Sequence, residues 1–291
     1  MANRRVLVKR RKAVKNIRKI TRTMQLIATA RFQATNQRAL STKPYSDKLG
    51  ELVADLSRAA GDVDHPLMHS PESDRSAMVV ITSNRGLCGG YNTNVLRQAI
   101  ARVDEQSAGE RSVDVHMIGK KGSNYFKFLG RDVKRSITDL SDDPRFEEIE
   151  PLANELINQF IAGEIDAVYV AYMAFESAGR QYPEIVQLLP LEPPSADGEE
   201  GSSRGLEYEF SPEPEELLGA LLPASVRMRL FQCFMEAVVS EHVARMVAMK
   251  AATDAAGDMI KSLSRQYNRA RQTHITMELL DIIGGVNALE G

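Results

Sequence analysis

The stretch RMVAMKAATDAAGDMIKSLSRQYNRARQTHITMELLDIIGGVNAL, residues 245–289, contains no proline and a single glycine, Gly257, before Gly284. The chain is also free of proline back to Pro223. Apolar or small residues return at helical spacing along this segment at Phe234, Val238, Ala252, Ala256, Met259, Leu263, Tyr267 and Ala270. The expected helix runs between Pro223 and Gly284. At about sixty residues and ~1.5 Å per residue it would be about 90 Å long, and it needs a partner along its side. The small residues of AMKAATDAAGD, residues 248–258, allow a second backbone to approach closely.

The N-terminal segment is the expected partner, because it has no proline or glycine before Pro44. Its predicted seam consists of Val14, Ile17, Thr21, Met24 and Ala28, with Ile20 and Ile27 beside them. Four cations are predicted on the opposite side, at Arg11, Lys15, Arg18 and Arg22. We expect a kink or short break at Pro44, and then helix from residue 45 to the vicinity of Gly61. The two ends of the chain are thus predicted to form an antiparallel coiled coil.

Between the two ends, apolar runs rich in Val and Ile alternate with helical patterns. The expected strands are residues 77–82, 113–119, 132–138, 165–175 and 184–191, and the expected helices are residues 93–103, 120–129 and 151–162. Such alternation is typical of a Rossmann-like, mainly parallel α/β domain, whose last two strands are predicted to form an edge hairpin. The expected domains are therefore the shaft, residues 1–60 with 217–291, the α/β domain, residues 75–192, and an acidic flexible loop and connector, residues 193–216.

The charges of the chain are segregated, although the net charge is only -2. Thirteen Lys and Arg precede Asp47, the first acidic residue, whereas residues 192–216 hold nine acids and one base. The basic end resembles a transit peptide only superficially, because it is poor in serine and continues into the predicted helix. Two cysteines, Cys88 and Cys233, have no CxxC spacing, so a reducing, cytoplasmic setting is expected.

A glycine-rich turn, SNRGLCGGYNTN at residues 83–94, looks at first like a phosphate cradle. It lacks the Lys and Ser/Thr of a P-loop and the GxGxxG spacing of a dinucleotide site, so strand-to-helix turn chemistry is the better interpretation. Cys88 is a poor candidate nucleophile, because His116 is the only plausible base and lies far away in sequence.

Other titratable pairs also have ordinary explanations. His65 and His69, with Asp62 and Asp64 nearby, lie in an expected surface loop and lack identifiable further metal ligands. Asp254 and Asp258 are flanked by Lys250 and Lys261, which predicts surface ion pairs. We therefore expect no catalytic residue, no metal and no cofactor in this chain.

The cationic N-terminal helix leaves three interpretations open. It could bind nucleic acid through phosphates, although Phe32 is the only aromatic residue of the segment. It could lie on a membrane surface, although its apolar stripe is modest and it has no Trp. The third interpretation, a protein partner with acidic loops, is favoured over the other two.

Three motifs together resemble the gamma subunit family of F-type ATP synthases: RKITRTMQLIATARF at residues 18–32, the turn at residues 83–94, and the stretch at residues 245–289. YEFSPEPEELLGALLP, residues 208–223, fits as well. The resemblance implies a non-catalytic rotor shaft that couples ion flow to ATP synthesis or hydrolysis at the beta subunits. It also implies alpha and beta subunits, the epsilon subunit and the membrane c-ring as partners, no nucleic acid, and a peripheral place on the cytoplasmic face of a bacterial plasma membrane.

By position, the resemblance assigns contacts with beta to Arg11, Lys15, Arg18, Lys19, Arg22, Met24, Arg269, Gln272, Thr276 and Glu278. The outer surface of the shaft is expected to be mostly smooth and polar, because a tight apolar grip would trap one angle. His274 and Ala255 depart from the residues usual in the family, and His274 would add a titrating group beside the surrounding subunits. The alternative function, from the basic helix alone, is a nucleic-acid-associated coiled-coil protein.

Overall fold

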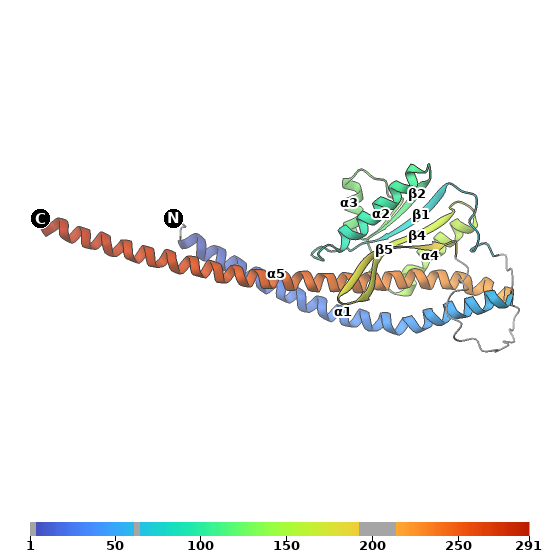
Figure 1. Ribbon diagram of the computed structural model, residues 1–291, viewed down its shortest axis with the longest axis horizontal. Helices are drawn as coiled ribbons and strands as arrows, with labels where there is room; N and C mark the ends of the chain where they lie inside the picture. The colour runs from blue at the N-terminus through green and yellow to red at the C-terminus, as the bar shows by residue number, and fades with distance from the viewer. Residues whose placement is uncertain (1–3, 61–64, 192–213, 291) are drawn as a thin grey trace. The chain divides into compact units, whose positions relative to one another are not determined.

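The computed structural model describes residues 4–60, 65–191 and 214–290. Two long helices, α1 (Arg4–Ala60) and α5 (Pro214–Glu290), form the ends of the chain (Figure 1). Between them, in chain order, lie β1 (Arg75–Ile81), α2 (Tyr91–Ala108), β2 (Ser112–Ile118), α3 (Lys120–Phe128), β3 (Arg135–Ile137), α4 (Phe146–Ile161), β4 (Ala167–Ser177) and β5 (Arg180–Leu189). The chain divides into a helical unit, Met1–Ala30 with Arg245–Gly291, and a sheet unit, Arg31–Ala244. Both α1 and α5 contribute to each unit.

The sheet has the strand order β3-β2-β1-β4-β5. β1 pairs in parallel with β2 and with β4, and β2 pairs in parallel with β3. β4 and β5 pair antiparallel, so the predicted edge hairpin is confirmed. The predicted combination of long terminal helices and a mainly parallel α/β domain is confirmed as well.

Helices cover both faces of this sheet, because β1 is buried on both sides. Met78 and Val80 pack with α2 and α3, whereas Val79 and Ile81 pack with α4 and with the part of α5 that belongs to the sheet unit. Figure 1 shows α2 and α3 on one side of the sheet and α5 on the other. A strand buried on both faces reads as a continuous apolar run, as AMVVI does here.

The sequence predicts a break or a helix end at or near Pro44, Pro151 and Pro223, but all three prolines lie inside helices. α1 continues through Pro44, so the predicted alternative of a break there is wrong, and Gly61 lies outside the described residues. α5 begins before Pro223 and runs on past Gly284, and α4 begins five residues before Pro151. A proline removes one backbone hydrogen bond at a cost of about 3 kcal/mol. Buried neighbours such as Leu222 and Leu152 offset that cost. Of the predicted acidic loop and connector, residues 193–216, residues 193–213 lie outside the described residues, and residues 214–216 belong to the start of α5.

In the helical unit, α1 and α5 run antiparallel. Arg11 lies over Tyr267, Arg18 lies next to Gly257, and Thr21 bonds to Thr253, so higher numbers on α1 meet lower numbers on α5. The buried residues of α1 follow a seven-residue interval, and in this unit they are Leu7, Thr21 and Ala28, with Val14 half-buried. The same interval continues in the sheet unit at Thr35, Leu49 and Leu56. Such a repeat is the pattern of a coiled-coil seam.

The predicted seam is therefore correct at Thr21 and Ala28 and wrong at Ile17, which is 51% exposed. Ile20 and Ile27 are also exposed, and so is Met259 on α5. The physical reason is local, because Gly257 has no side chain and the guanidinium of Arg18 lies against it. Arg18, the residue after Ile17, therefore lies beside α5 here, while Ile17 stays exposed. The predicted functional division into residues 1–60 with 217–291 and residues 75–192 stays a prediction.

Candidate functional site

The five cations assigned to the partner surface fall into two groups on α1. Lys15, Lys19 and Arg22 are exposed, and an Nη of Arg22 donates to Gln25 Oε1 at 3.2 Å. Arg11 differs, because its guanidinium carbon lies 5.1 Å from the centroid of the Tyr267 ring on α5. Arg18 remains exposed but lies 3.8 Å from the position that a Cβ on Gly257 would take.

The prediction that Arg11 and Arg18 point to the side opposite α5 is therefore wrong. Arginine can lay its aliphatic stem and planar head along a neighbouring surface while its charge stays in contact with water. A cation over an aromatic face is worth ~0.5–1 kcal/mol at exposed sites. These two side chains thus stabilise the helix pair and still contribute to its positive side.

The interior of the pair contains a polar contact between the two helices. Thr253 Oγ1 donates to Thr21 Oγ1 at 2.8 Å, and both residues are buried, with exposed fractions of 6% and 9%. Each hydroxyl also reaches a carbonyl of its own helix, that of Arg18 or that of Met249. A single buried polar contact in an apolar seam fixes the register of two helices. Met24, which was also assigned to the partner surface, is half-buried and follows Thr21 by three residues.

The four assigned residues of α5 lie nearer its C-terminal end. Arg269, Gln272, Thr276 and Glu278 are all exposed, as is every described side chain of residues 271–287. In Figure 1 this end of α5 extends beyond the N-terminus of α1. The structure therefore places the assigned residues of α1 on the paired part of the helical unit. The assigned residues of α5 lie on or next to its unpaired end.

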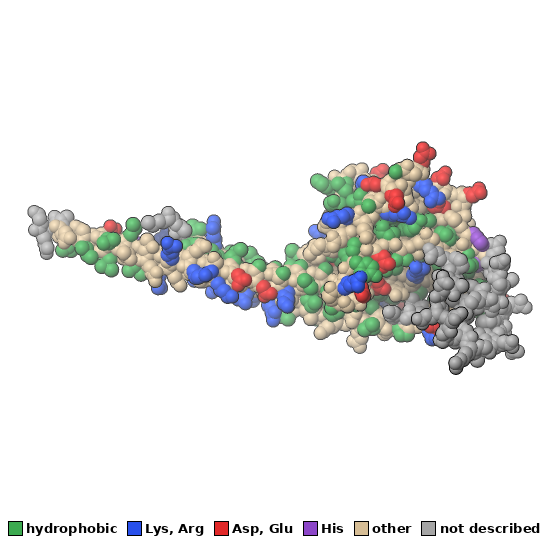
Figure 2. Space-filling view, viewed as in Figure 1, with side chains coloured by type: hydrophobic (Ala, Val, Ile, Leu, Met, Phe, Trp, Pro, Cys, Tyr) green, Lys and Arg blue, Asp and Glu red, His purple; other side chains and the backbone are tan. Residues whose placement is uncertain are grey.

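The surface of the unpaired end is more apolar than expected. Seven large apolar side chains are exposed there: Ile275, Met277, Leu279, Leu280, Ile282, Ile283 and Val286. Figure 2 shows hydrophobic side chains near the C-terminus of α5, and Lys and Arg side chains where α1 runs beside it. The expectation of a mostly polar outer surface is therefore wrong for this end. His274 Nδ1 lies 3.3 Å from Glu278 Oε1 on the same exposed helix.

In the sheet unit, the glycine-rich turn between β1 and α2 is held by bonds among its own residues. Asn92 Oδ1 accepts the backbone N–H of Ser83 at 2.9 Å, and Asn92 Nδ2 donates to Ser83 Oγ at 2.8 Å. Positive φ angles occur at Leu87 and Gly89. Cys88 is buried, with its sulfur 3.2 Å from Asn92 Nδ2. These contacts fit a turn that fixes the start of α2 on the end of β1.

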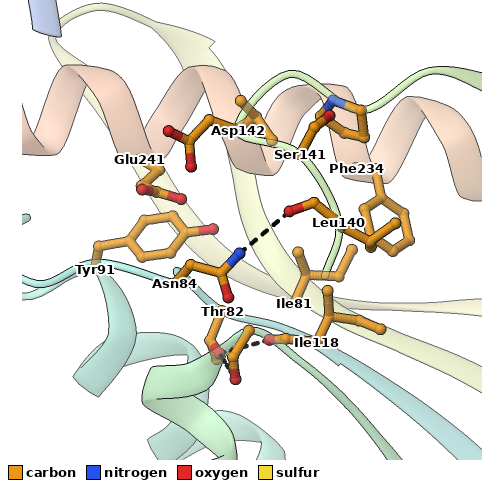
Figure 3. Close-up of a pocket in the computed structure, with 13 residues that line it drawn as sticks. Ile81, Thr82, Asn84, Tyr91, Ile118, Leu140, Ser141, Asp142, Phe234 and Glu241 are labelled. Atoms are coloured by element: carbon orange, nitrogen blue, oxygen red, sulfur yellow. Dashed lines mark hydrogen bonds between the residues drawn. The ribbon is translucent and has the colours of Figure 1, made fainter. Parts of the chain in front are cut away.

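A small pocket opens beside this turn, at the carboxyl ends of β1 and β2 (Figure 3). Asn84 Nδ2 donates to the carbonyl of Leu140 at 3.3 Å across it. The carboxylates of Asp142 and Glu241 both lie on the α5 side of the pocket, near the ring of Tyr91.

Two further glycines, which sequence reasoning missed, make the close packing around the end of β2 possible. Gly119 has φ 92°, and a Cβ on Gly122 would lie 2.3 Å from Met117 Sδ and 2.6 Å from Thr82 Oγ1. The spacing GKKG directly after an apolar strand was the available signal.

His116 lies inside the sheet unit and is fully buried. Neither ring nitrogen has a hydrogen-bond partner among the described residues. Burial lowers the pKa of His116. Nearby charges act on this pKa in both directions: Glu155 and Asp114 raise it, and Lys134 and Arg135 lower it. No hydrogen bond joins Cys88 to His116 among the described residues, so the two do not form a pair of nucleophile and base.

Among residues 4–60, 65–191 and 214–290, no group of three or more His, Cys, Asp or Glu side chains is placed to hold a metal ion. Asp62 and Asp64 lie outside the described residues. His65 Nδ1 accepts the backbone N–H of Leu67 at 3.2 Å, and Lys261 Nζ pairs with Asp258 at 3.1 Å as predicted. Within those same ranges, no helix is both long and apolar enough to cross a membrane.

Solved structures of similar fold come from mitochondrial ATP synthases. A chain from the Tetrahymena thermophila central stalk and c-ring structure matches with a TM-score of 0.60 at 20% identity, covering 80% of this chain and 99% of that one. A chain from the Euglena gracilis rotor matches with a TM-score of 0.61 at 18% identity, covering 94% and 98%. At these identities the similarity shows the fold alone.

Sequence relatives are closer. The gamma chain of ATP synthase from Rhodopirellula baltica is 45% identical over 298 aligned positions, covering 100% of both chains. The gamma chain from Leptospira biflexa is 41% identical, covering 99% of this chain and 100% of the relative. A family model described as ATP synthase matches residues 3–289. The chain therefore belongs to the ATP synthase gamma chain family.

Proposed function

We propose that this chain is the central rotor shaft of an F-type ATP synthase and that it couples ion flow through the membrane sector to ATP synthesis or hydrolysis. It carries no catalytic residue of its own in this proposal, since the nucleotides bind to the alpha and beta subunits. The observation that carries the proposal is the antiparallel α1/α5 pair, from which the apolar end of α5 extends alone.

The helix pair has the asymmetry that a rotor needs. One side of α1 carries the exposed cations Lys15, Lys19 and Arg22, whereas another side exposes Ile17, Ile20 and Ile27. A shaft that differs from side to side stabilises a different conformation in each of three surrounding beta subunits. Rotation then passes each beta subunit through the same states in turn.

The proposed contacts follow the charges. The cations of α1, from Arg11 to Arg22, meet acidic loops of beta, with Met24 beside them. Arg269, Gln272, Thr276 and Glu278 make polar contacts with beta further along α5. The sheet unit, with the parts of α1 and α5 that belong to it, meets epsilon and the c-ring. The chain is then peripheral on the cytoplasmic face of a bacterial plasma membrane, held there through the complex, without a cofactor and without nucleic acid.

The test is reconstitution of the chain with alpha, beta, epsilon and the membrane sector, followed by a rotation assay. Lys19→Glu with Arg22→Glu reverses two exposed charges without disturbing the contact of Arg18 with Gly257. We expect reduced ion pumping per ATP hydrolysed. The matched control is Lys120→Glu with Lys127→Glu, which reverses two exposed charges on α3.

Two results would overturn the proposal. One is a chain that forms no stoichiometric complex with alpha and beta but is retained on DNA in a salt-sensitive way, which supports the nucleic-acid alternative. The other is a complex that rotates and pumps equally well without this chain. Normal pumping by the Lys19 and Arg22 variant alone would remove the cationic side from the mechanism and leave the shaft in place.

A further inference from the structure

The loop between β3 and α4 is attached to α1 by two ion pairs. Arg31 pairs with Asp142, and Arg38 pairs with Asp143. The two arginines are seven residues apart, two helical turns, so they lie on the same side of α1. All four residues belong to the sheet unit. Two adjacent carboxylates in one loop thus hold one helix at two points that are two turns apart.

Asp142 also joins this loop to the sheet. Arg85, from the turn after β1, has an Nη 3.3 Å from Asp142 Oδ2, and Asn84 of the same turn donates to Leu140. Partial burial opposes ionisation of Asp142, but the hydrogen bond from Arg31 and the charges of Arg85, Arg31 and His242 outweigh it and lower its pKa. The carboxylate is therefore ionised at neutral pH and is shared by two arginines from different elements.

The same stretch of α1 has few large apolar contacts. Its fully buried residue is Thr35, and Ala39 packs at the edge of the core. Phe32 meets Phe175 of β4 with ring centroids 6.2 Å apart. Dispersion contacts of small side chains resist separation of two surfaces, but they are non-directional and resist sliding or turning poorly. Charge-assisted hydrogen bonds from arginine have a defined geometry and do resist such movement.

We propose that Arg31 and Arg38, with Asp142 and Asp143, form a latch by which the sheet unit holds α1, and that they are positioning residues for coupling. This inference rests on the proposed rotor function. A load on the sheet unit reaches α1 through the latch, and α1 carries it on towards its N-terminal part. Without the latch, α1 turns or slides against the sheet unit under load, and ATP hydrolysis continues with less pumping.

The experiment uses the reconstituted ATP synthase. Arg31→Glu with Arg38→Glu puts repulsion in both pairs. Adding Asp142→Arg, Asp143→Arg and Arg85→Glu restores attraction in the opposite sense at each contact, because Arg85 also pairs with Asp142. We expect the reversed variant to lose about threefold in ions pumped per ATP hydrolysed, the order of change that two half-exposed pairs support. Unloaded hydrolysis should stay at the wild-type rate, and the five-residue swap should recover most of the pumping.

The control is an ion pair of similar exposure inside the sheet unit that does not involve α1. Arg131 pairs with Asp104 at 2.6 Å, and exchanging these two residues should leave coupling unchanged. Arg31→Lys with Arg38→Lys, which keeps both charges, should retain more coupling than Arg31→Gln with Arg38→Gln. Loss of pumping per ATP separates a positioning role from general instability, which lowers hydrolysis and pumping together.

The outcomes are decisive in both directions. Unchanged pumping per ATP in the reversed variant overturns the latch, and so does a loss that the five-residue swap does not repair. If the reversed variant does not assemble, the glutamine variant decides, because wild-type coupling there also overturns the latch. The rotor function itself fails only if the wild-type chain gives no coupling in the same assay, so the two failures are distinguishable.

Discussion

The bond between Thr21 and Thr253 gives a sharp test of the helix pair. Replacing threonine by valine keeps the shape of the side chain and exchanges the hydroxyl for a methyl group. Helix propensity changes little, since the two residues rank together. Three chains are compared with the wild type: Thr21→Val, Thr253→Val and the double variant.

The structure sets the expected magnitudes. Either single change removes the 2.8 Å cross-helix bond and leaves the other hydroxyl with a carbonyl of its own helix, Arg18 for Thr21 and Met249 for Thr253. The remaining hydroxyl is then satisfied but faces a methyl group, so each single variant should lose about 1 kcal/mol of unfolding free energy. The double variant replaces both partners by apolar groups, which is close to neutral. Its loss should therefore be smaller than the sum of the single losses by about 1–2 kcal/mol.

Urea unfolding of the full chain, followed by circular dichroism, measures these differences. The matched control is Thr23→Val, because Thr23 is exposed and its hydroxyl donates to Lys19 of its own helix at 3.0 Å. We expect the control to change the unfolding free energy by less than about 0.5 kcal/mol. Single and double losses that add within about 0.3–0.5 kcal/mol would show that the two hydroxyls are not coupled, and the pairing described here would be refuted.

Three further predictions concern stability. His116→Leu should raise the unfolding free energy by about 1 kcal/mol, because it removes a buried and unpartnered ring. Since burial lowers the pKa of His116, protonation favours the unfolded chain, and wild-type stability should fall as pH drops below about 6.5, less so in the variant; equal pH profiles in thermal melts would contradict this. Gly122→Ala should cost about 1–3 kcal/mol through its clash with Met117, whereas Gly219→Ala, in open space on α5, should be neutral or stabilising in urea unfolding. Ile17→Asp should cost under about 1 kcal/mol, but Ala28→Asp several, because Ala28 is buried; equal melting shifts for these two variants would place the seam elsewhere.

The sequence predicted the sheet well, because buried strands and their turns have local signals. Runs of Val and Ile marked β1, β2 and β4, and β3 is shorter than predicted because only three of its residues pair at the sheet edge. Helix ends were harder to predict. Proline is a strong local breaker, but Pro44 and Pro223 lie inside helices. Beside Pro223, Leu222 and Val226 are held in the core of the sheet unit by residues far away in sequence.

The seam of the coil shows the same limit. A three- and four-residue pattern fits several neighbouring stripes of α1, and Ile17 is the more apolar choice than Thr21. The seven-residue interval from Leu7 to Leu56 was present in the sequence and would have selected the buried stripe. What no single helix reveals is the partner's surface. Here Gly257 of α5, which has no side chain, leaves room for the guanidinium of Arg18.

The helical unit buries little apolar surface for its length. Its fully buried apolar side chains, among the described residues, are Leu7, Ala28, Met249, Ala256 and Leu263, and two of these are alanines. Alanines bring the two helix axes close together, which gives a narrow pair, but each contributes little transfer free energy. The end of α5 goes further and exposes large apolar side chains that no described part of the chain covers. An apolar surface of that kind marks a binding site, and whatever encloses it stabilises the folded helix by mass action. A shaft of this design gains its stiffness inside the proposed ring of subunits, so its stability belongs to the assembly more than to the isolated chain.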